Sequence, residues 1–348
     1  MRRHRPHRAR AWLARRDAAG HGHRAHGRLA AGGRRLSALV TGGAGFIGRH
    51  VVAELLQRGE PVRVLDNLSR SRSAGLEAFE GDPAYSGLIQ ADVTDADAVS
   101  GAMADVDTVY HLAADVAVGA SVRDPTGAMR ANVLGTLVVT EAARRRDLRL
   151  VLVSTCHVYA AANEPLAEDA AAIPASPYAA SKLAAEIIAQ SYARTYGLRL
   201  TTVRPFNVYG PWQRDDAEGG VVARFLSRDL AGAPLEVHGD GAQTRDFVYV
   251  EDCARGIVDA ATESAVDLTL NLASGAETSI TQLARLIAGD PSRVRHVPHP
   301  HPEAEVARYI GDAALARQAV GWTPRVDLAE GLARTRAWFA GRARGVGT

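Results

Sequence analysis

The amino-acid sequence predicts an α/β fold, with a doubly wound parallel sheet and a smaller, mixed α/β lobe towards the C-terminus. Strand-like and helix-like segments alternate from residue 36 to about residue 205, the pattern of a parallel sheet with helices on both faces. Beyond residue 205 the segments shorten and become rich in Pro, Gly and His. We therefore expect 36–205 to form the sheet domain, with segments near 245–273 returning to it. Residues 206–244 and 274–348 should form the lobe.

The first predicted strand, residues 36–41, runs into Gly42-Gly-Ala-Gly-Phe-Ile-Gly48 and then into a helix that extends to about Gln57. A strand, a glycine turn and a helix in this order are the context of a dinucleotide-binding fingerprint. Gly42 permits the tight turn, Gly45 lets the backbone approach a pyrophosphate, and Gly48 lets the helix pack closely on the strand. The helix N-terminus then offers unpaired N–H groups to the phosphates. The sequence thus predicts a dinucleotide site at this turn.

The second predicted strand, residues 61–65, ends at Asp66. A carboxylate at this place accepts hydrogen bonds from ribose hydroxyls and repels a 2′-phosphate. Asp66 therefore favours NAD over NADP, although Arg70 and Arg72 nearby keep NADP open as an alternative.

Later strands carry small or polar residues where they end. We expect strands at 88–93, which includes Asp92, at 107–114, at 150–155 and at 198–203, and a long helix that contains Asn132. Carboxyl ends of parallel strands meet at one edge of the sheet, where open α/β sheets bind their ligands. Thr155 should therefore lie at the same edge as the glycine turn. Residues 204–211 look like a loop.

Lys182 is the only lysine among the 41 basic residues of the chain. Tyr178 lies four residues earlier, and Pro177 suits the first turn of a helix, so phenol and ammonium should share one helix face. A free phenol titrates near pH ~10, and acting as a base at neutral pH requires a shift of about three units, or roughly 4 kcal/mol. One positive charge about 4 Å away, at an effective dielectric constant of 20, supplies that amount. The pair therefore predicts a tyrosine base.

Composition sets the broad class. The chain has 348 residues, of which 47% are hydrophobic and 23% charged, as in a soluble globular protein. No apolar run approaches ~20 residues, so we expect no membrane span. Cys156 and Cys253 are far apart and lack CxxC spacing, so we expect neither a metal site nor a disulfide framework. Reduced cysteines are typical of the cytoplasm, which is therefore the expected location.

The N-terminal segment differs from the body. Residues 1–36 contain eleven arginines, five histidines and one acidic residue. Such a segment lacks the apolar content to fold, and we expect residues 1–35 to be disordered. A segment without function, a polyanion-binding arm and a transit-like peptide remain open. For the body we expect no nucleic-acid role.

A series of motifs then occurs in order along the chain. They are TGGAGFIG at 41–48, DNL at 66–68, HLAA at 111–114, NVLGT at 132–136, STCHVY at 154–159, YAASK at 178–182, RPFNVYGP at 204–211, GDGAQTRDFVYVED at 239–252 and GWTP at 321–324. With them the chain resembles the extended short-chain dehydrogenase/reductase family, and within it the NAD-dependent epimerases and dehydratases of nucleotide sugars, of the UDP-glucose 4-epimerase type. The resemblance covers roughly residues 36–340.

The resemblance implies a Rossmann-type fold, bound NAD, a nucleoside-diphosphate sugar in the lobe and a homodimer. It implies that Tyr178 removes the proton of the sugar 4-hydroxyl while C4 gives a hydride to NAD, that Thr155 hydrogen-bonds the same oxygen, and that Lys182 holds the nicotinamide ribose and lowers the pKa of Tyr178. The implied cofactor-binding residues are Gly42, Gly45, Phe46, Ile47, Gly48, Asp66, Asn67, Asp92, Val93, Leu112, Ala113, Ala114, Asn132, Tyr178 and Lys182.

The residues after Thr155 differ from those of the dehydratases in the family that the chain resembles. Those enzymes carry an acidic residue just after the Thr155 position, where this chain has Cys156 and His157. This departure favours a 4-epimerase that turns over a 4-keto intermediate. A 4,6-dehydratase, a 3,5-epimerase, a 4-ketoreductase and an idle dinucleotide-binding module are the alternatives. Cys156 and His157 either line the pocket or transfer a proton.

The implied substrate contacts are Asn207 and Arg245 at the diphosphate and Tyr309 at the sugar. A second phosphate-binding arginine of the relatives falls on Pro302, and Arg308 or a nearby histidine is the expected substitute.

Overall fold

The computed structural model describes residues 38–71, 73–216, 219–299 and 305–343. The segment 1–35, for which the sequence predicts disorder, lies outside these residues. The part described here belongs to one compact unit, residues 36–348.

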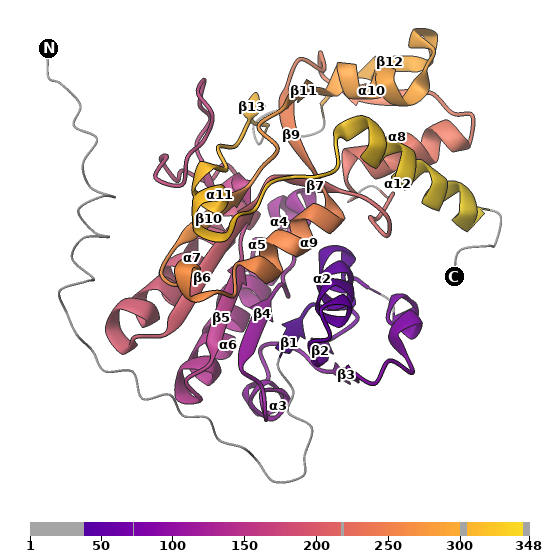
Figure 1. Cartoon of the computed structure of the whole chain (residues 1–348). Coiled ribbons are helices and arrows are strands. Elements are labelled where there is room, and N and C mark those ends of the chain that lie inside the picture. Colours follow the sequence, from indigo (N-terminus) through magenta and orange to yellow (C-terminus); the bar gives the residue numbers. More distant parts are fainter. Residues whose placement is uncertain (1–37, 72, 217–218, 300–304, 344–348) are drawn as a thin grey trace, which may run out of the picture. The chain divides into compact units, whose positions relative to one another are not determined.

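A seven-stranded parallel sheet organises the structure. Its strands occur in the order β10-β6-β5-β4-β1-β2-β3, and all their pairings are parallel (Figure 1). The chain winds outwards in both directions from the neighbours β1 and β4, which confirms the doubly wound fold. The strands are β1 (Ala38–Thr41), β2 (Val62–Asp66), β3 (Tyr85–Gln90), β4 (Thr108–His111), β5 (Arg149–Val153), β6 (Arg199–Pro205) and β10 (Thr269–Leu272).

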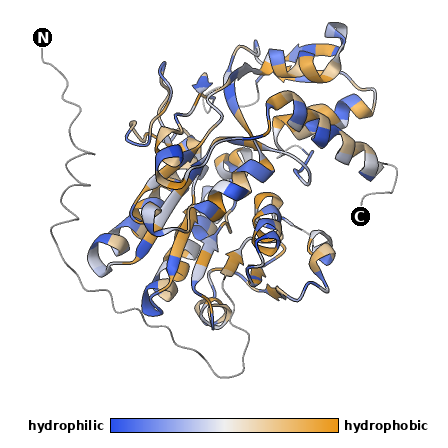
Figure 2. Cartoon of the chain, viewed as in Figure 1, coloured by the Kyte–Doolittle hydropathy of each residue, from blue (hydrophilic) through white to orange (hydrophobic). Residues whose placement is uncertain are grey.

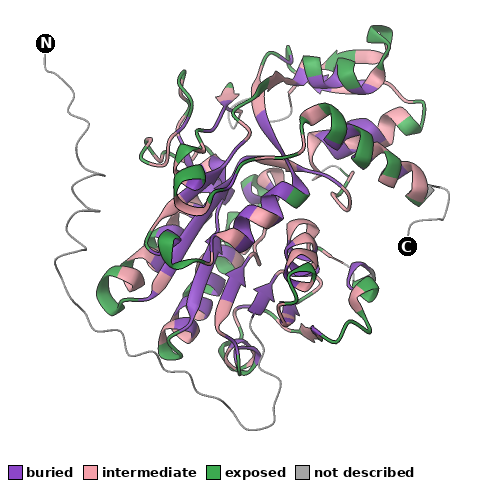
Figure 3. Cartoon of the chain, in the orientation of Figure 1, coloured by how far each residue is buried: buried purple, intermediate pink, exposed green. Residues whose placement is uncertain are grey.

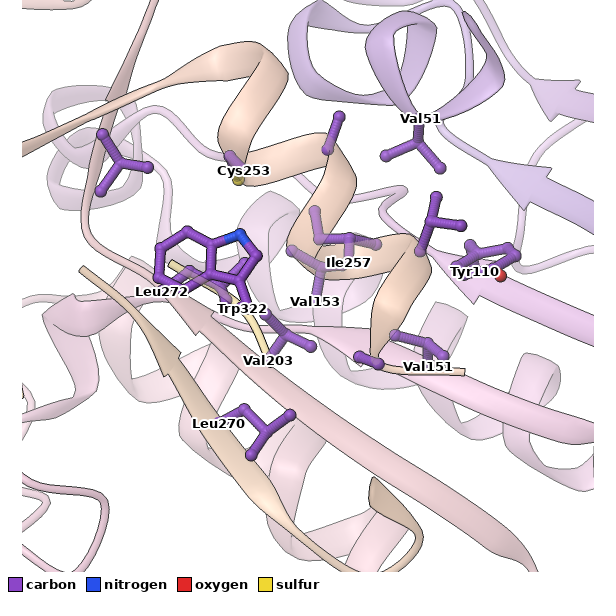
Figure 4. Packing of buried hydrophobic residues seen from close by; sticks show 14 of the residues in the cluster. Val51, Tyr110, Val151, Val153, Val203, Cys253, Ile257, Leu270, Leu272 and Trp322 are labelled. Carbon is purple, nitrogen blue, oxygen red and sulfur yellow. The ribbon is translucent and has the colours of Figure 1, made fainter. Parts of the chain in front are cut away.

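One face of the sheet packs against α2 (Phe46–Gln57) and α9 (Val250–Asp259). Val40, Val64 and Val151 point to this face, because alternate residues of a strand lie on the same side. Figure 4 shows side chains of α9, including Ile257, between α2 and the indole of Trp322. Helix α9 thereby packs against both α2 and the sheet.

The opposite face packs against α3 (Ala96–Ala102), α6 (Gly135–Arg145) and α7 (Pro177–Tyr196). Leu39, Leu65 and Leu150 point to this face. Burial on both sides explains why these strands are nearly continuous apolar runs. Figure 3 shows buried residues along the sheet, with exposed residues on the outer turns of the helices.

The C-terminal lobe is built on two smaller sheets. The first is a four-stranded sheet in which β9 (Thr244–Tyr249) pairs with β7 (Asn207–Tyr209), β11 (Glu277–Ser279) and β13 (Arg308–Tyr309). The second pairs β8 (Leu235–His238) with β12 (Val294–Val297). The lobe helices are α8 (Val221–Leu230), α10 (Ile280–Ala288) and α12 (Leu328–Ala343).

Three further helices lie against the sheet domain. Helix α11 (Ala314–Val320) packs near β10, and the two short helices α4 (Val118–Arg123) and α5 (Pro125–Met129) adjoin α7.

Several predicted boundaries differ from the structure. The segment 204–211 is not a plain loop, because β6 continues to Pro205 and β7 follows. Within the segment expected to return to the main sheet, β9 belongs to the lobe sheet, whereas α9 and β10 pack on or join the main sheet. Pairing partners this distant in sequence leave no local signal. The division into two domains at the predicted residues stays a prediction.

Two other differences are local. The third strand ends at Gln90, two residues before Asp92, and the long helix expected around Asn132 is interrupted by a π-helical turn at Arg130–Leu134. Such a turn has i→i+5 hydrogen bonds in place of the i→i+4 bonds of the α-helix.

In the described part of the chain, no helix combines the length and apolar character needed to cross a membrane. Figure 2 shows the hydrophobic residues concentrated in the strands and on the inner sides of the helices.

Candidate active site

The glycine turn between β1 and α2 leaves no room for side chains at two positions. Gly42 has a φ of +72°, and a Cβ there would lie 2.7 Å from the backbone nitrogen of Ala113. A Cβ at Gly48 would overlap the carbonyl oxygen of Gly42 and lie 2.8 Å from the Cα of Gly43. At these two positions the turn therefore packs tightly against the segment after β4 and against its own backbone, which only glycine allows.

Helix α2 begins at Phe46, with Gly45 as its N-cap and no side chain that caps the first N–H groups. No acidic residue lies in the first turn. The unpaired N–H groups of Phe46 and Ile47 and the positive dipole end suit an anion such as a pyrophosphate.

Asp66 ends β2 beside this turn and is 8% exposed. Its Oδ2 accepts a hydrogen bond from the backbone of Ala44 at 3.1 Å, and its Oδ1 accepts from Leu68 at 2.8 Å. These bonds fix the carboxylate and leave further lone pairs for ribose hydroxyls. Arg70 is paired with Asp115 at 2.9 Å, so its guanidinium is engaged by a carboxylate.

The next cofactor candidates lie around the ends of β3 and β4. Asn67 donates to Oδ2 of Asp92 at 2.8 Å, and Thr94 donates to Oδ1 of the same carboxylate. Burial, the largest single effect, raises the pKa of Asp92, but these hydrogen bonds together with the charge of Arg130 outweigh it, so the pKa is lowered. Val93 is buried against Gly135. Leu112, Ala113 and Ala114 continue from β4, next to Gly42.

Asn132 is fully buried, and its amide group is occupied by protein partners. Its Oδ1 accepts from the backbone of Asp115 at 2.7 Å, and its Nδ2 donates to the carbonyl of Asp115 at 2.9 Å and to Ser181 at 2.8 Å. Ser181 in turn donates to the carbonyl of Tyr178. Asn132 thus connects the segment after β4 with α7.

Helix α7 begins as the sequence predicts, with Ser176 as N-cap and Pro177 in the first turn. The Ser176 hydroxyl accepts from the backbone of Ala179 at 3.2 Å, and the hydroxyl of Ser121 accepts from the backbone of Tyr178 at 3.1 Å. These bonds fix the start of the helix at the carboxyl edge of the sheet.

Tyr178 is 7% exposed, and its burial raises the pKa of the phenol to about 12, against a lowering effect of its hydrogen bond with Thr155. The sequence predicts the opposite direction, because it anticipates a neighbouring positive charge but not the burial. The side chains of the protein alone therefore do not make Tyr178 a phenolate at neutral pH, and additional positive charge beside the ring is required.

Lys182 is 3% exposed. Burial lowers the pKa of its ammonium to about 8, while the charge of Glu186 raises it. Among the described residues no hydrogen bond engages the ammonium group. A buried, unpartnered ammonium is a group that a bound ligand can satisfy.

Cys156 and His157 form a short 3-10 turn after Thr155. Burial raises the pKa of the Cys156 thiol to about 12 and lowers the pKa of His157 to about 4, with the charge of Arg245 also lowering the latter. At neutral pH the thiol is protonated and the imidazole is neutral. The His157 ring lies 5.2 Å from the ring of Tyr309 and 6.2 Å from that of Tyr178.

Two cavities adjoin these residues. The first has a volume of about 180 Å³ and the second about 220 Å³, and Arg245 and Glu305 line both. The first is lined also by Val118, His157, Ala175, Ser176, Ala179, Val306 and Tyr309, and the second also by Asn207, Val221, Arg224, Phe225, Glu236, His238, Gln243, Ile280 and His299. Arg245 and Glu305 are thus common to the two cavities.

Arg245 lies at the junction of the cavities. It forms an ion pair with Glu305, donates to the carbonyl of Val306 at 2.9 Å and lies over the ring of Tyr309 at 5.4 Å. Glu305 also pairs with His299 at 3.0 Å. The structure brings Asn207, Arg245 and Tyr309 to the cavities.

Arg308 is not brought to the cavities. It precedes Tyr309 in β13, and successive residues of a strand point to opposite faces. Arg308 pairs with Glu277 of β11 at 2.9 Å and also donates to the carbonyl of Asn163. The expectation that Arg308 substitutes for the missing arginine therefore has no support in the geometry, and Arg224 lines the second cavity instead.

Sequence reasoning did not find Glu305, Arg224, Ser181 or Glu186 as parts of this region. For Ser181 and Glu186 a signal exists, because they lie three and eight residues after Tyr178 on one helix. The packing of the lobe places Glu305 and Arg224 at the cavities, and no local pattern in the sequence predicts this position.

The comparison with protein families decides the class. Residues 38–273 match the model of the "NAD dependent epimerase/dehydratase family". The chain belongs to this family. Its members are enzymes that act on nucleotide sugars, and the match includes the glycine turn, Asp66 and the Tyr178 helix.

Individual family members with full-length similarity differ in their reactions. The chain is 38% identical to the UDP-glucose 4-epimerase of Mycolicibacterium smegmatis, over 88% of this chain and 99% of that protein. It is 32% identical to the UDP-N-acetyl-alpha-D-glucosaminuronate decarboxylase of Bacillus cytotoxicus, over 86% and 97%. The solved structure of Pal from Bacillus thuringiensis has a TM-score of 0.86 and 40% identity, and the match covers 88% of this chain and 99% of Pal.

The family's cofactor is NAD, and the residues of this chain fit it. Gly42 and Gly48 exclude any Cβ, as the tight turn and the close packing of helix on strand in a dinucleotide-binding fingerprint require. Asp66 is fixed by backbone N–H groups at the end of β2, and the ammonium of Lys182 is buried without a protein acceptor in the described chain.

Proposed function

We propose that the protein is an NAD-dependent nucleotide-sugar 4-epimerase that works through a transient 4-keto sugar. The observation that carries this proposal is the pair of cavities that meet at Arg245, one of them beside Tyr178 and His157. A sugar in the first cavity and a nucleoside in the second would place their diphosphate at the guanidinium. Arginine suits such a group because its planar fork binds phosphate oxygens in pairs.

Tyr178 is the proposed acid and base. As the phenolate, Tyr178 takes the proton of the sugar 4-hydroxyl, and the phenol so formed later returns a proton to the 4-keto oxygen; in the chain alone the group is a phenol that is hydrogen-bonded to Thr155. Lys182 contributes positive charge on the same helix. NAD, when bound, supplies the redox chemistry by accepting a hydride from the sugar and returning it to the other face.

Glycine backbone and polar groups at the sheet edge are the proposed cofactor contacts. We assign the pyrophosphate to the turn with Gly42, Gly45, Phe46, Ile47 and Gly48, and the ribose and adenine to Asp66, Asn67, Asp92 and Val93. The segment 112–114 would lie beside the nicotinamide half, and Asn132 holds Asp115, the residue that follows this segment.

The neighbours of Thr155 favour epimerisation over elimination. Cys156 is a buried, protonated thiol, and the carboxylate that lines the first cavity, Glu305, is engaged by Arg245 and His299. Elimination of water across C5 and C6 needs an additional acid and base. The similarity to a UDP-glucose 4-epimerase also supports the proposal.

For the substrate, we propose that Arg224 and Arg245 bind the diphosphate together with Asn207, and that Tyr309 limits the bulk of the sugar. Arg224 faces the second cavity, and its burial lowers its pKa from the ordinary value, as expected of a guanidinium placed to receive an anion. Arg224 thereby takes the place that the sequence left to Arg308.

We further propose a cytoplasmic homodimer. Large apolar side chains are exposed on α5, the π-helical turn, α6 and α7, which pack against one another. They are Met129, Leu134, Leu137 and Ile187, with exposures of 37, 42, 37 and 55%. A face of this kind is typical of a subunit interface. Sedimentation of the parent and of a Leu137→Glu/Ile187→Glu variant tests it, and a parent protein that sediments as a monomer would rule out the dimer.

Purified, NAD-loaded protein should be incubated with UDP-, dTDP- and GDP-hexoses and the products identified by NMR. We expect one substrate to equilibrate with its C4 epimer without added cofactor. A stable 4-keto-6-deoxy sugar would replace the proposal with a dehydratase, and a requirement for added NADPH would replace it with a reductase.

A further inference from the structure

Three charged side chains are buried together along α7 and β6. Lys182, Glu186 and Arg204 are 3, 1 and 6% exposed. Glu186 lies four residues after Lys182, which places both on one side of the helix. Burying three charges is costly unless each has a partner, so their arrangement requires an explanation.

Arg204 engages both oxygens of the Glu186 carboxylate. Its Nε donates to Oε1 at 3.0 Å and its Nη2 donates to Oε2 at 2.6 Å. Its Nη1 donates to the carbonyl of Glu168 at 3.1 Å, and the guanidinium lies 4.7 Å from the centre of the Tyr159 ring. Arg204 is itself fixed, so it holds the carboxylate in one orientation.

Lys182 receives the charge of Glu186 without receiving its hydrogen bonds. Within the described residues Glu186 pairs with Arg204 and makes no ion pair with Lys182. Its negative charge nonetheless raises the pKa of the ammonium, which burial alone would lower further. The ammonium stays available to the groups at the sheet edge.

Stability alone does not account for this pair. A buried ion pair is frequently replaced by apolar residues of similar size without loss of stability, because desolvation offsets the attraction. Because the ammonium of Lys182 lies one helical turn away, an effect of the Glu186 charge on Lys182 explains the presence of the pair more simply.

We propose that Glu186 is a positioning residue that keeps the Lys182 side chain in its charged form, and that Arg204 holds the Glu186 carboxylate back from the ammonium. The inference rests on the proposed function in one respect, namely that a charged Lys182 assists Tyr178. The charge of Lys182 can be measured without any turnover.

Other groups near Lys182 have to be considered with it. His111 of β4 lies on the sheet side, where burial and the charge of Lys182 lower its pKa to about 3, so it is neutral. Other titratable and charged groups of the elements around α7 act elsewhere: Cys156 and Asp115 act on Tyr178, Arg130 acts on Asp92, and Glu141 is hydrogen-bonded to Arg144 and Arg145. Further charged or titratable residues of these elements are Arg123, Asp124, His157 and Arg199. Glu186 is the group that acts on Lys182.

A single lysine makes the test direct. Protein grown with ¹³Cε-lysine, without a lysine-containing tag, gives one lysine signal, and its chemical shift against pH reports the pKa of Lys182. The variants are Glu186→Gln, Arg204→Gln and the double variant. Asp229→Asn is the matched control, since Asp229 is a nearly buried carboxylate paired with Arg293 in the lobe, with a side-chain exposure of 7%.

The two single variants should move the pKa in opposite directions. Glu186→Gln should lower the pKa of Lys182 by about one unit or more, and Arg204→Gln should raise it, because the freed carboxylate turns to the ammonium. Asp229→Asn should leave it at the parent value. If the pair exerts no electrostatic influence on the ammonium, neither variant should move the pKa, and an unchanged pKa in Glu186→Gln would overturn the proposal.

If a single variant fails to fold, the double variant decides. Removing both charges leaves the ammonium without its nearest counter-ion, so the pKa should still fall, and a parent-like pKa would refute the proposal. With an active enzyme, the alkaline limb of kcat/KM should move to lower pH in Glu186→Gln and return towards the parent in Glu186→Asp. Absence of epimerase activity would reject the proposed function but leave the NMR result valid.

Discussion

The substitution Gly48→Ala tests the dinucleotide site at its tightest contact. The new Cβ would overlap the Gly42 carbonyl oxygen and lie 2.8 Å from the Cα of Gly43. Carbon atoms pack at roughly 3.5 Å or more, so the contact with Gly43 alone requires the turn to widen by about 0.7 Å, and the overlap with the carbonyl oxygen requires more. Both atoms belong to the backbone, so no side-chain rotation relieves the overlap. We expect this overpacking to cost about 1–3 kcal/mol.

Gly101→Ala in α3 is the matched control, because a Cβ there meets no atom within 4 Å. Both variants gain roughly 1 kcal/mol of helix propensity, so the difference between their unfolding free energies isolates the clash. NAD binding, measured by calorimetry, should weaken at least about tenfold in Gly48→Ala, equivalent to about 1.4 kcal/mol, and stay at the parent value in Gly101→Ala. Gly48→Ala protein with parent affinity for NAD would contradict the assignment of the turn.

Two further predictions concern charge. Burial holds the pKa of His50 and His157 near 4 and that of His111 near 3, so the unfolded chain binds protons that the folded chain does not once the pH falls below about 6.5. Stability should therefore be full above pH 6.5 and fall between pH 6.5 and 4 by about 1.4 kcal/mol per pH unit for each histidine, and urea unfolding should show a shallower loss in His111→Asn. In substrate kinetics, Arg224→Gln and Arg245→Gln should each raise KM about tenfold or more, whereas Arg308→Gln should leave KM unchanged; a rise for Arg308 alone would reverse the substrate assignment.

Features fixed by short-range spacing could be predicted from the sequence. The glycine turn, Asp66 at a strand end and the start of α7 at Pro177 depend on residues within a few positions of one another, and the structure places them at one sheet edge.

Features fixed by packing could not. The direction of Arg308 depends on how β13 pairs with β9, and the partner of Arg245, Glu305, is 60 residues away. The pKa of Tyr178 depends on burial, which the i to i+4 spacing does not report. In each case the missing information is a contact between distant parts of the chain.

Conversion of a nucleotide sugar by Tyr178→Phe protein is the most direct test of the chemistry. The variant removes the one oxygen that is proposed to carry the proton and leaves the ring in place. If it is folded and loaded with NAD, we expect its turnover to drop by about 10²–10⁴-fold. Turnover at the rate of the parent protein would contradict a tyrosine base.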